Sequence, residues 1–263
     1  MATATATKKK AKKKTAGVNR ISGNGQTDIV TSGFTEITLR EPSFPSVDIH
    51  VEGISMLCTH TFSTKTEHQL LENQLGGAAK KKQTLEARCP ELEFVDSMYW
   101  LDETKKPEFT YNKKDNTWSF DKKKLAKAVS TAKFGLPLTG FKNAAISACR
   151  TSTYKMTHMR QILFLSSLED PDYAVIESPT PPVMRNDIVR LANGNPMVRF
   201  RGAWEKWSVK FRCEFNSAVF TAEEVVNLFH LAGLSVGVCE GRPEKSALGW
   251  GRFRVTSNKK LIK

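Results

Sequence analysis

The residue types best suited to chemistry in this 263-residue sequence are concentrated in one segment, Gly237 to Val255. Its glycines let the backbone approach a partner closely and expose amide N–H groups, its basic residues carry positive charge, and Trp250 offers a ring on which a base can stack. Single-stranded nucleic-acid binding needs this combination; a glycine-rich turn packed on the core, with Trp250 buried, is the alternative. The candidate contacts are Gly241, Arg242, Lys245, Gly249, Trp250, Gly251 and Arg252.

A second candidate segment runs from Leu136 to Arg150. Thr139 introduces apolar and small residues at helical spacing, which predicts a buried helix over 140–150. Lys142 lies near the start of this helix and Arg150 at its end.

No complete catalytic site is visible among the titratable residues. The histidines are scattered, and the five cysteines are widely spaced with no Cys-x-x-Cys pair, so neither a zinc site nor a disulfide framework is predicted. Cys58 and His60 stand close together in an apolar strand; this could indicate a thiol nucleophile, but the spacing is common by chance. Nothing singles out a catalytic aspartate among Asp96, Asp102 and Asp170. The sequence predicts no catalytic residue, metal or cofactor, and leaves enzymatic activity open.

The charge of the chain indicates a polyanionic partner. The formal net charge is +13, and the first twenty residues carry seven cations and no acid, so subtracting seven leaves +6 for the rest. A basic chain attracts nucleic acid or an anionic membrane surface. No stretch reaches the roughly 20 apolar residues of a membrane span, and the N-terminus lacks the apolar core of a signal peptide. We therefore expect a cytoplasmic protein, in the bacterial host cytoplasm if the source is viral, that does not bind membranes.

The clearest strand pattern is the alternation of apolar and polar residues over 198–215. If the two strands in this range pair through a turn near 202–205, four cations share one sheet face: Arg199, Arg201, Lys210 and Arg212. Such a face suits a phosphate backbone, although a bare solvent-exposed face is the alternative. Trp204, at the expected turn, is the first candidate to stack on a base, whereas Trp207 is expected in the core.

The remaining pattern predicts one α+β domain over 35–256, with a disordered basic tail and linker over 1–34 and a basic tail over 257–263. A lysine-rich insertion around 104–133 is expected to form a hairpin followed by a short amphipathic helix. A helix over 221–233 carries a capping-box pattern, Thr221 with Glu224, and Gly233 stands where a left-handed terminator is expected. Other expected elements are a helix over 66–75 and strands over 35–39, 47–57, 162–165, 173–176 and 252–255.

The two candidate segments together resemble the RAMP superfamily, the ferredoxin-like RNA-binding proteins of CRISPR systems. The segment ending in Gly249-Trp250-Gly251-Arg252-Phe253 resembles that superfamily's glycine-rich loop, and Leu136 to Arg150 resembles the proline, glycine and lysine motif of its backbone subunits. The pair is also similar to uncharacterised proteins of tailed bacteriophages. One departure is Phe141, which replaces the usual serine pair after the glycine.

The resemblance implies a ferredoxin-like (RRM-like) core, with an antiparallel sheet and helices on one face, to which the lysine-rich insertions are added. It also implies that Lys142 and Arg150 contact a nucleic-acid backbone and that the loop 241–251 clasps the chain or its neighbour.

The leading hypothesis is a non-catalytic protein that binds the phosphate backbone of single-stranded RNA or DNA and assembles along the strand as a homo-oligomer or filament. The alternatives are a phage single-strand DNA binding or annealing protein in replication or recombination, a metal-independent ribonuclease on the same fold, and a structural protein whose basic tail alone neutralises nucleic acid.

Overall fold

The computed structural model describes residues 43–61, 67, 70, 71, 74, 75, 87–167, 169–190 and 194–256. These residues belong to one compact unit, Pro42–Lys263. The expected tail and linker 1–34, the strand 35–39 and the tail 257–263 lie outside the described residues, as does half of the expected helix 66–75, whose five described positions are helical. Within the described part, no helix is long and apolar enough to span a membrane.

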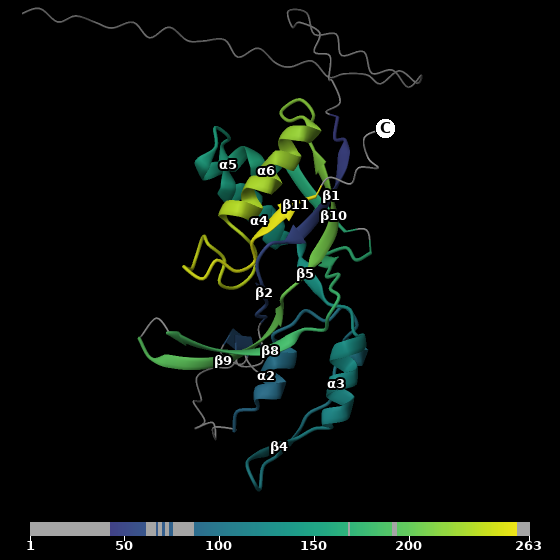
Figure 1. The fold of residues 1–263 in the computed structure, drawn as a ribbon, viewed down its shortest axis with the longest axis vertical. Helices are drawn as coiled ribbons and strands as arrows, with labels where there is room; N and C mark the ends of the chain where they lie inside the picture. The colour runs from purple at the N-terminus through teal and green to yellow at the C-terminus, as the bar shows by residue number, and fades with distance from the viewer. Residues whose placement is uncertain are drawn as a thin grey trace, which may run out of the picture. The chain divides into compact units, whose positions relative to one another are not determined.

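The central sheet has four antiparallel strands in the order β11-β1-β10-β6. One helix, α4, connects β1 to β6 through intervening segments, and a second, α6, connects β10 to β11 (Figure 1). This β-α-β-β-α-β order with the last strand beside the first is the ferredoxin-like core, which confirms the predicted α+β fold. The elements are β1 (Ser46–Gly53), α4 (Leu138–Ala148), β6 (Leu163–Ser166), β10 (Ser208–Phe215), α6 (Ala222–Ser235) and β11 (Phe253–Val255).

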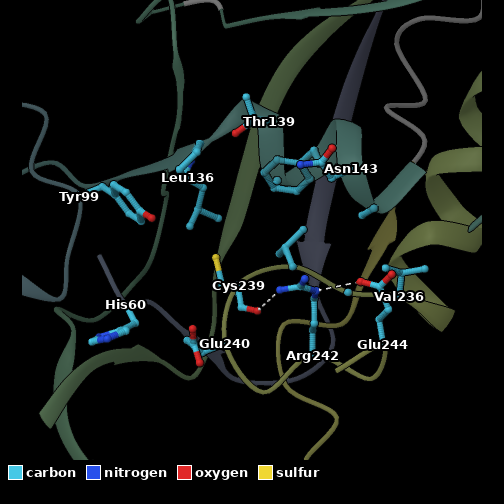
Figure 2. Close-up of a pocket in the computed structure, with 16 residues that line it drawn as sticks. His60, Tyr99, Leu136, Thr139, Asn143, Val236, Cys239, Glu240, Arg242 and Glu244 are labelled. Atoms are coloured by element: carbon cyan, nitrogen blue, oxygen red, sulfur yellow. Dashed lines mark hydrogen bonds and ion pairs between the residues drawn. The ribbon is translucent and has the colours of Figure 1, made fainter. Parts of the chain in front are cut away.

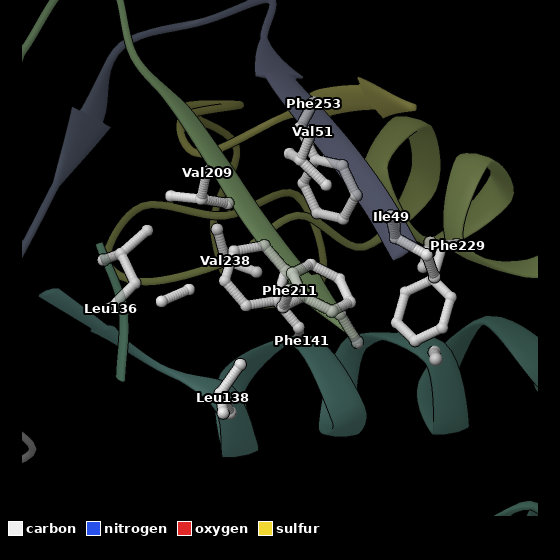
Figure 3. Close-up of a cluster of buried hydrophobic side chains, with 14 of the residues drawn as sticks. Ile49, Val51, Leu136, Leu138, Phe141, Val209, Phe211, Phe229, Val238 and Phe253 are labelled. Atoms are coloured by element: carbon white, nitrogen blue, oxygen red, sulfur yellow. The ribbon is translucent and has the colours of Figure 1, made fainter. Parts of the chain in front are cut away.

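Aromatic side chains join both helices to the same face of the sheet (Figure 3). Phe141 of α4 packs on Phe211 of β10 and on Phe253 of β11, with ring centroids 4.9 and 5.6 Å apart. Phe229 of α6 lies 5.4 Å from Phe211, and all four rings are fully buried. Burying such rings contributes about 1.5–3 kcal/mol each. Phe141, the departure from the RAMP motif, is thus a core residue.

Helix α6 begins at the residue that the sequence predicts, but it ends later than predicted. Thr221 Oγ1 accepts a hydrogen bond from the Glu224 amide at 3.2 Å, and the Glu224 carboxylate accepts one from the Thr221 amide at 2.8 Å, so the capping box is confirmed. The prediction that Gly233 terminates the helix is wrong, because α6 continues to Ser235 and the left-handed residue is Gly237, at φ +72°. Gly233 instead allows close packing, since a Cβ there would overlap the carbonyl oxygen of Phe253.

A second sheet, with strand order β2-β9-β8, contains the long antiparallel ribbon formed by β8 and β9 (Figure 1). Its register places Arg185 opposite Arg201 and Asp187 opposite Arg199. The sequence analysis missed β8, whose residues are exposed on alternate positions without a continuous apolar face. The strands are β2 (Leu57–Cys58), β8 (Val183–Arg190) and β9 (Pro196–Trp204).

The predicted pairing of the two strands within 198–215 is wrong. β9 pairs with β8 and β2, whereas β10 pairs with β1 and β6, so the two strands belong to different sheets. The tryptophans on either side of the connection explain the change of sheet, because Trp204 and Trp207 are both buried and fix the chain at this corner. Trp207 Nε1 also donates to the carbonyl oxygen of Ser55 at 2.9 Å, which confirms that Trp207 is a core residue.

The insertion has the expected hairpin and helix. β3 pairs with β4, and α3 follows, with Asp121 capping its first amides. A short pair of strands, β5 with β7, brings the chain to the start of α4. The remaining elements are α2 (Pro90–Asp96), the 3₁₀ turn η1 (Glu103–Lys105), β3 (Thr110–Asn112), β4 (Thr117–Ser119), α3 (Lys122–Thr131), β5 (Gly135–Pro137), the 3₁₀ turn η2 (Cys149–Thr151), α5 (Met156–Ile162) and β7 (Tyr173–Val175).

Candidate nucleic-acid interface

The start of α4 and the loop between α6 and β11 line a single pocket of about 280 Å³ (Figure 2). Thr139, Gly140 and Asn143 line it from α4, whereas Glu240 and Arg242 line it from the loop. The two segments that the sequence analysis singled out therefore meet in space, although nearly a hundred residues separate them in the chain. Further lining residues are His60, Tyr99, Leu136, Pro137, Phe141, Ala144, Val236, Gly237, Val238, Cys239 and Glu244.

Glycines and backbone hydrogen bonds fix the loop. Gly251 has φ +63°, and a Cβ at this position would overlap the carbonyl oxygen of Val238. The Val238 amide donates to the Gly251 carbonyl at 2.9 Å, and the Gly251 amide donates to the Met56 carbonyl at 2.8 Å. The Glu240 amide donates to the Cys58 carbonyl at 3.0 Å. The loop is thus tied to the segment around β2.

Trp250 is half-buried between two neighbours rather than standing free. Gly241 lies against the ring, since a Cβ there would overlap it, and the Trp250 amide donates to the Gly241 carbonyl at 3.0 Å. The guanidinium carbon of Arg185 lies 4.7 Å from the ring centroid. A base that stacks on Trp250 must therefore displace Arg185 or occupy the part of the ring that stays exposed.

Glu244 connects the loop to the end of α4. Its carboxylate accepts from Arg150 Nη1 at 3.3 Å and from Arg242 Nε at 3.2 Å. Burial raises the pKa of Glu244, but hydrogen bonds from Ser147 and Arg242 outweigh it, so the pKa lies below its usual value. Arg150 keeps 60% of its side chain exposed, and Lys245 is exposed as well. Two of the predicted cations thus face solvent beside the pocket.

Further predicted residues belong to the same loop. Gly249, at φ +71°, has open space where a Cβ would be. Arg252 donates from Nε to the Leu234 carbonyl at 3.2 Å, which ties the last part of the loop to α6. The structure therefore brings the loop residues close to Arg150, which reaches the loop at Glu244.

Arg199 and Arg201 form a partly buried network on β9 that reaches the pocket through His60 and Glu240. Arg199 contacts His60 Nε2, and Arg201, only 6% exposed, lies 3.9 Å from Asp187 and 3.7 Å from Glu240. Burial, followed by the charges of Arg199 and Arg201, lowers the pKa of His60. The imidazole is therefore neutral near pH 7 and accepts from Arg199.

The sheet face that carries Lys210 and Arg212 is not the positive face expected from the sequence. Lys210 lies 2.8 Å from Glu177, and Arg212 holds Asp48 at 2.7 Å across the β1–β10 register. The hydrogen bond from Arg212 lowers the pKa of Asp48. The prediction that four cations share one face is wrong for two reasons. It combined residues of two sheets, and it omitted the two acids beside these cations, Asp48 of β1 and Glu177.

Two further candidates lie away from the pocket. Lys142 Nζ is 5.2 Å from the ring centroid of Phe164 on β6, and Lys142 does not line the pocket. Trp204, the first stacking candidate, is 2% exposed and packs on Phe134 with centroids 5.6 Å apart. It therefore cannot stack on a base while the core is intact.

Sequence reasoning missed several pocket residues that the fold assembles. Thr139 and Asn143 are four residues apart in α4 and share one helix face, a spacing that could have indicated their common direction. Tyr99 carried no such signal, because it reaches the pocket from a distant segment, and Glu240 lies in the segment 237–255 but was not among its expected contacts.

Two cysteines lie at or near this pocket, Cys239 in its lining and Cys58 on β2. Burial raises the pKa of Cys58 to about 11 and that of Cys239 to about 12, so both thiols stay protonated near pH 7 and the Cys58–His60 spacing yields no thiolate. No group of three or more His, Cys, Asp and Glu side chains in the described residues could hold a metal ion.

Comparisons with known proteins give a limited result. No protein-family model matches the chain, and no curated protein matches it. Among solved structures, it is similar to a chain in the cryo-EM structure of the Type III-B Cmr-beta bound to cognate target RNA, with 10% sequence identity and a TM-score of 0.37. The match covers 80% of this chain and 59% of that chain.

Proposed function

We propose that this chain binds the backbone of single-stranded nucleic acid at the surface where the start of α4 meets the loop 237–251, as RAMP proteins are expected to do. The observation that carries the proposal is that both candidate segments line one pocket with exposed cations at its edge. A phosphate backbone needs positive charge that it can reach, and Lys245 and Arg150 provide exposed positive charge at this edge.

The charges on this surface favour the binding of a polyanionic ligand. Lys245 is exposed and Arg150 is largely so, and the chain keeps a charge of +6 after its first twenty residues are subtracted. No side chain caps the first amides of α4, whose N-terminal Thr139 and Gly140 line the pocket. The Leu138 amide donates to the Asp172 carbonyl at 3.0 Å, and the helix dipole at this start favours a negative group. Assembly of several copies along one strand is part of the proposal.

A metal-independent ribonuclease is the second candidate, and His60 is the observation that favours it. The ring lines the pocket, its pKa is lowered, and its Nδ1 is buried without a hydrogen-bond partner. Because Nε2 accepts from Arg199, the neutral ring carries its proton on Nδ1, so His60 can take a proton from a ribose hydroxyl only once Arg199 leaves Nε2. Cleavage of bound RNA that disappears in His60→Ala would decide for this candidate.

Strand binding is tested by fluorescence anisotropy with a labelled 20-nucleotide strand, in RNA and DNA form, over a range of salt concentrations. Removing one phosphate contact by Lys245→Ala or Arg150→Ala should weaken binding about three- to tenfold and lower the salt slope by about 0.7. Lys122→Ala, which removes an exposed charge from α3, is the matched control and should change little. Equal effects of all three variants would contradict the proposed surface.

The same titration on the chain without residues 1–20 separates the surface from the basic tail. If the tail alone carries the affinity, this shortened chain loses all binding. If the surface binds the strand, binding persists and remains sensitive to Lys245→Ala.

A further inference from the structure

The pocket between α4 and the loop has apolar walls and polar groups that suit a planar neutral ligand. Its charged lining groups are Glu240, Arg242 and Glu244, because His60 is neutral near pH 7. Glu244 is already compensated by Arg242 and Arg150. Glu240 is only loosely paired, at 3.7 Å from Arg201. The charges around the pocket are thus largely compensated, and the loosely paired Glu240 carboxylate is left to accept hydrogen bonds.

The two sides of the pocket carry complementary hydrogen-bonding groups (Figure 2). Thr139 and Asn143 stand on the α4 side, both exposed, and Glu240 stands on the loop side. Apolar walls come from Leu136 and Val238. Ligand sites commonly combine apolar walls with a few convergent polar groups, and about 280 Å³ is slightly below the 300–1,000 Å³ of sites for drug-sized ligands. One nucleotide base fits this description.

We infer that this pocket receives a base of the bound strand and prefers bases that carry an exocyclic amino group, such as cytosine. The inference rests on the proposed function, since the phosphates at Arg150 and Lys245 would bring the base to the pocket mouth. The Glu240 carboxylate accepts the amino hydrogens, whereas it can only repel the carbonyl oxygen of uracil at the same position. Asn143 donates to the ring nitrogen or carbonyl of the base and can accept in return.

The base arrives unstacked from its neighbours, which is how proteins read single strands. Its apolar faces replace water on Leu136 and Val238, and Arg242 remains at the edge of the pocket through its bonds to the Cys239 carbonyl and Glu244. The strand then contributes two separable parts to binding. The backbone supplies salt-dependent affinity, and the pocket supplies preference between bases.

Cytosine and uracil provide the sharpest test, because they differ only at the amino or carbonyl group and the neighbouring ring nitrogen. Anisotropy titrations of the full chain should show that a labelled 12-nucleotide oligocytidine binds about five- to tenfold more tightly than the matching oligouridine. In Glu240→Gln the preference should fall below twofold, because an amide donates to uracil as readily as it accepts from cytosine. Glu205→Gln, at an exposed position before β10, removes the same charge and should keep the preference.

The possible outcomes separate the inference from the proposed function. Tight binding of both strands with no difference between them overturns the base pocket and leaves backbone binding standing. If neither strand binds, saturation-transfer NMR of the full chain with free cytidine and uridine tests the base pocket by itself. A cytidine signal that is stronger than that of uridine and is lost in Glu240→Gln supports the pocket; equal or absent signals overturn it.

Discussion

At the scale of single residues, Glu244 binds two of the arginines that the sequence analysis expected to contact a phosphate backbone. Its two carboxylate oxygens bind Arg150 and Arg242 at 3.3 and 3.2 Å, and its side chain is only 15% exposed. Arginine forks bind carboxylates and phosphates with the same geometry. Glu244 connects the loop to the end of α4, and under the proposed function it would compete with a strand for both guanidinium groups.

Neutralising this carboxylate should increase strand affinity. In Glu244→Gln, Arg150 and Arg242 are released, so we expect binding about two- to fivefold tighter, with a steeper salt dependence measured by anisotropy. The free energy of unfolding should fall by no more than about 1 kcal/mol, because Arg150 is largely exposed and such pairs are weak. Glu169→Gln, which breaks the exposed pair with Lys133, is the control and should leave strand affinity unchanged. Weaker binding in Glu244→Gln would show that Glu244 acts mainly by holding the loop in shape.

At the scale of elements, the loop after α6 depends on glycines that differ in their surroundings. Gly251 and Gly249 both have positive φ, at +63° and +71°. A Cβ at Gly251 would overlap the Val238 carbonyl, a backbone group that cannot move without breaking the hydrogen bonds of the loop. A Cβ at Gly249 would meet nothing within 4 Å. The first glycine is needed for packing, and the second only for its backbone conformation.

These two positions provide a matched pair of substitutions. Gly249→Ala should cost about 1–2 kcal/mol of unfolding free energy for the left-handed conformation. Gly251→Ala should cost about 3 kcal/mol or more, because it adds a clash with backbone. Urea unfolding followed by tryptophan fluorescence measures both. Equal losses would show that the loop relaxes around Gly251 and is softer than its hydrogen bonds indicate.

Sequence patterns within a few residues predict single helices and strands better than they predict which strands share a sheet. The capping box of α6, the buried helix α4 and the hairpin and helix of the insertion all follow from patterns within a few residues. The end of α6 was misplaced because Gly233 is needed for packing against Phe253, a contact with a residue twenty positions later. A glycine pattern alone cannot separate a helix terminator from a close contact.

At the scale of the whole molecule, the order of strands decided which predicted residues share a surface. The alternation of apolar and polar residues predicts strands over 198–215, but it does not show which strands pair with each other. The predicted pairing of β9 with β10 is wrong for this reason, because β9 pairs with β8 and β10 pairs with β1. The acids that neutralise Lys210 and Arg212 come from β1 and from Glu177, which a local pattern cannot reveal. In contrast, the glycine loop and Leu136–Arg150 were expected to serve one strand, and they line one pocket.

The central claim is that a strand lies across the meeting point of α4 and the glycine loop. The most direct measurement is photo-cross-linking of the full chain to a single strand that contains 4-thiouridine, followed by mass spectrometry of the linked peptides. The account predicts cross-links within 136–150 and 236–252, and few to β10, where Lys210 and Arg212 are paired with acids. Cross-links confined to residues 208–215 or to residues 1–20 would contradict it.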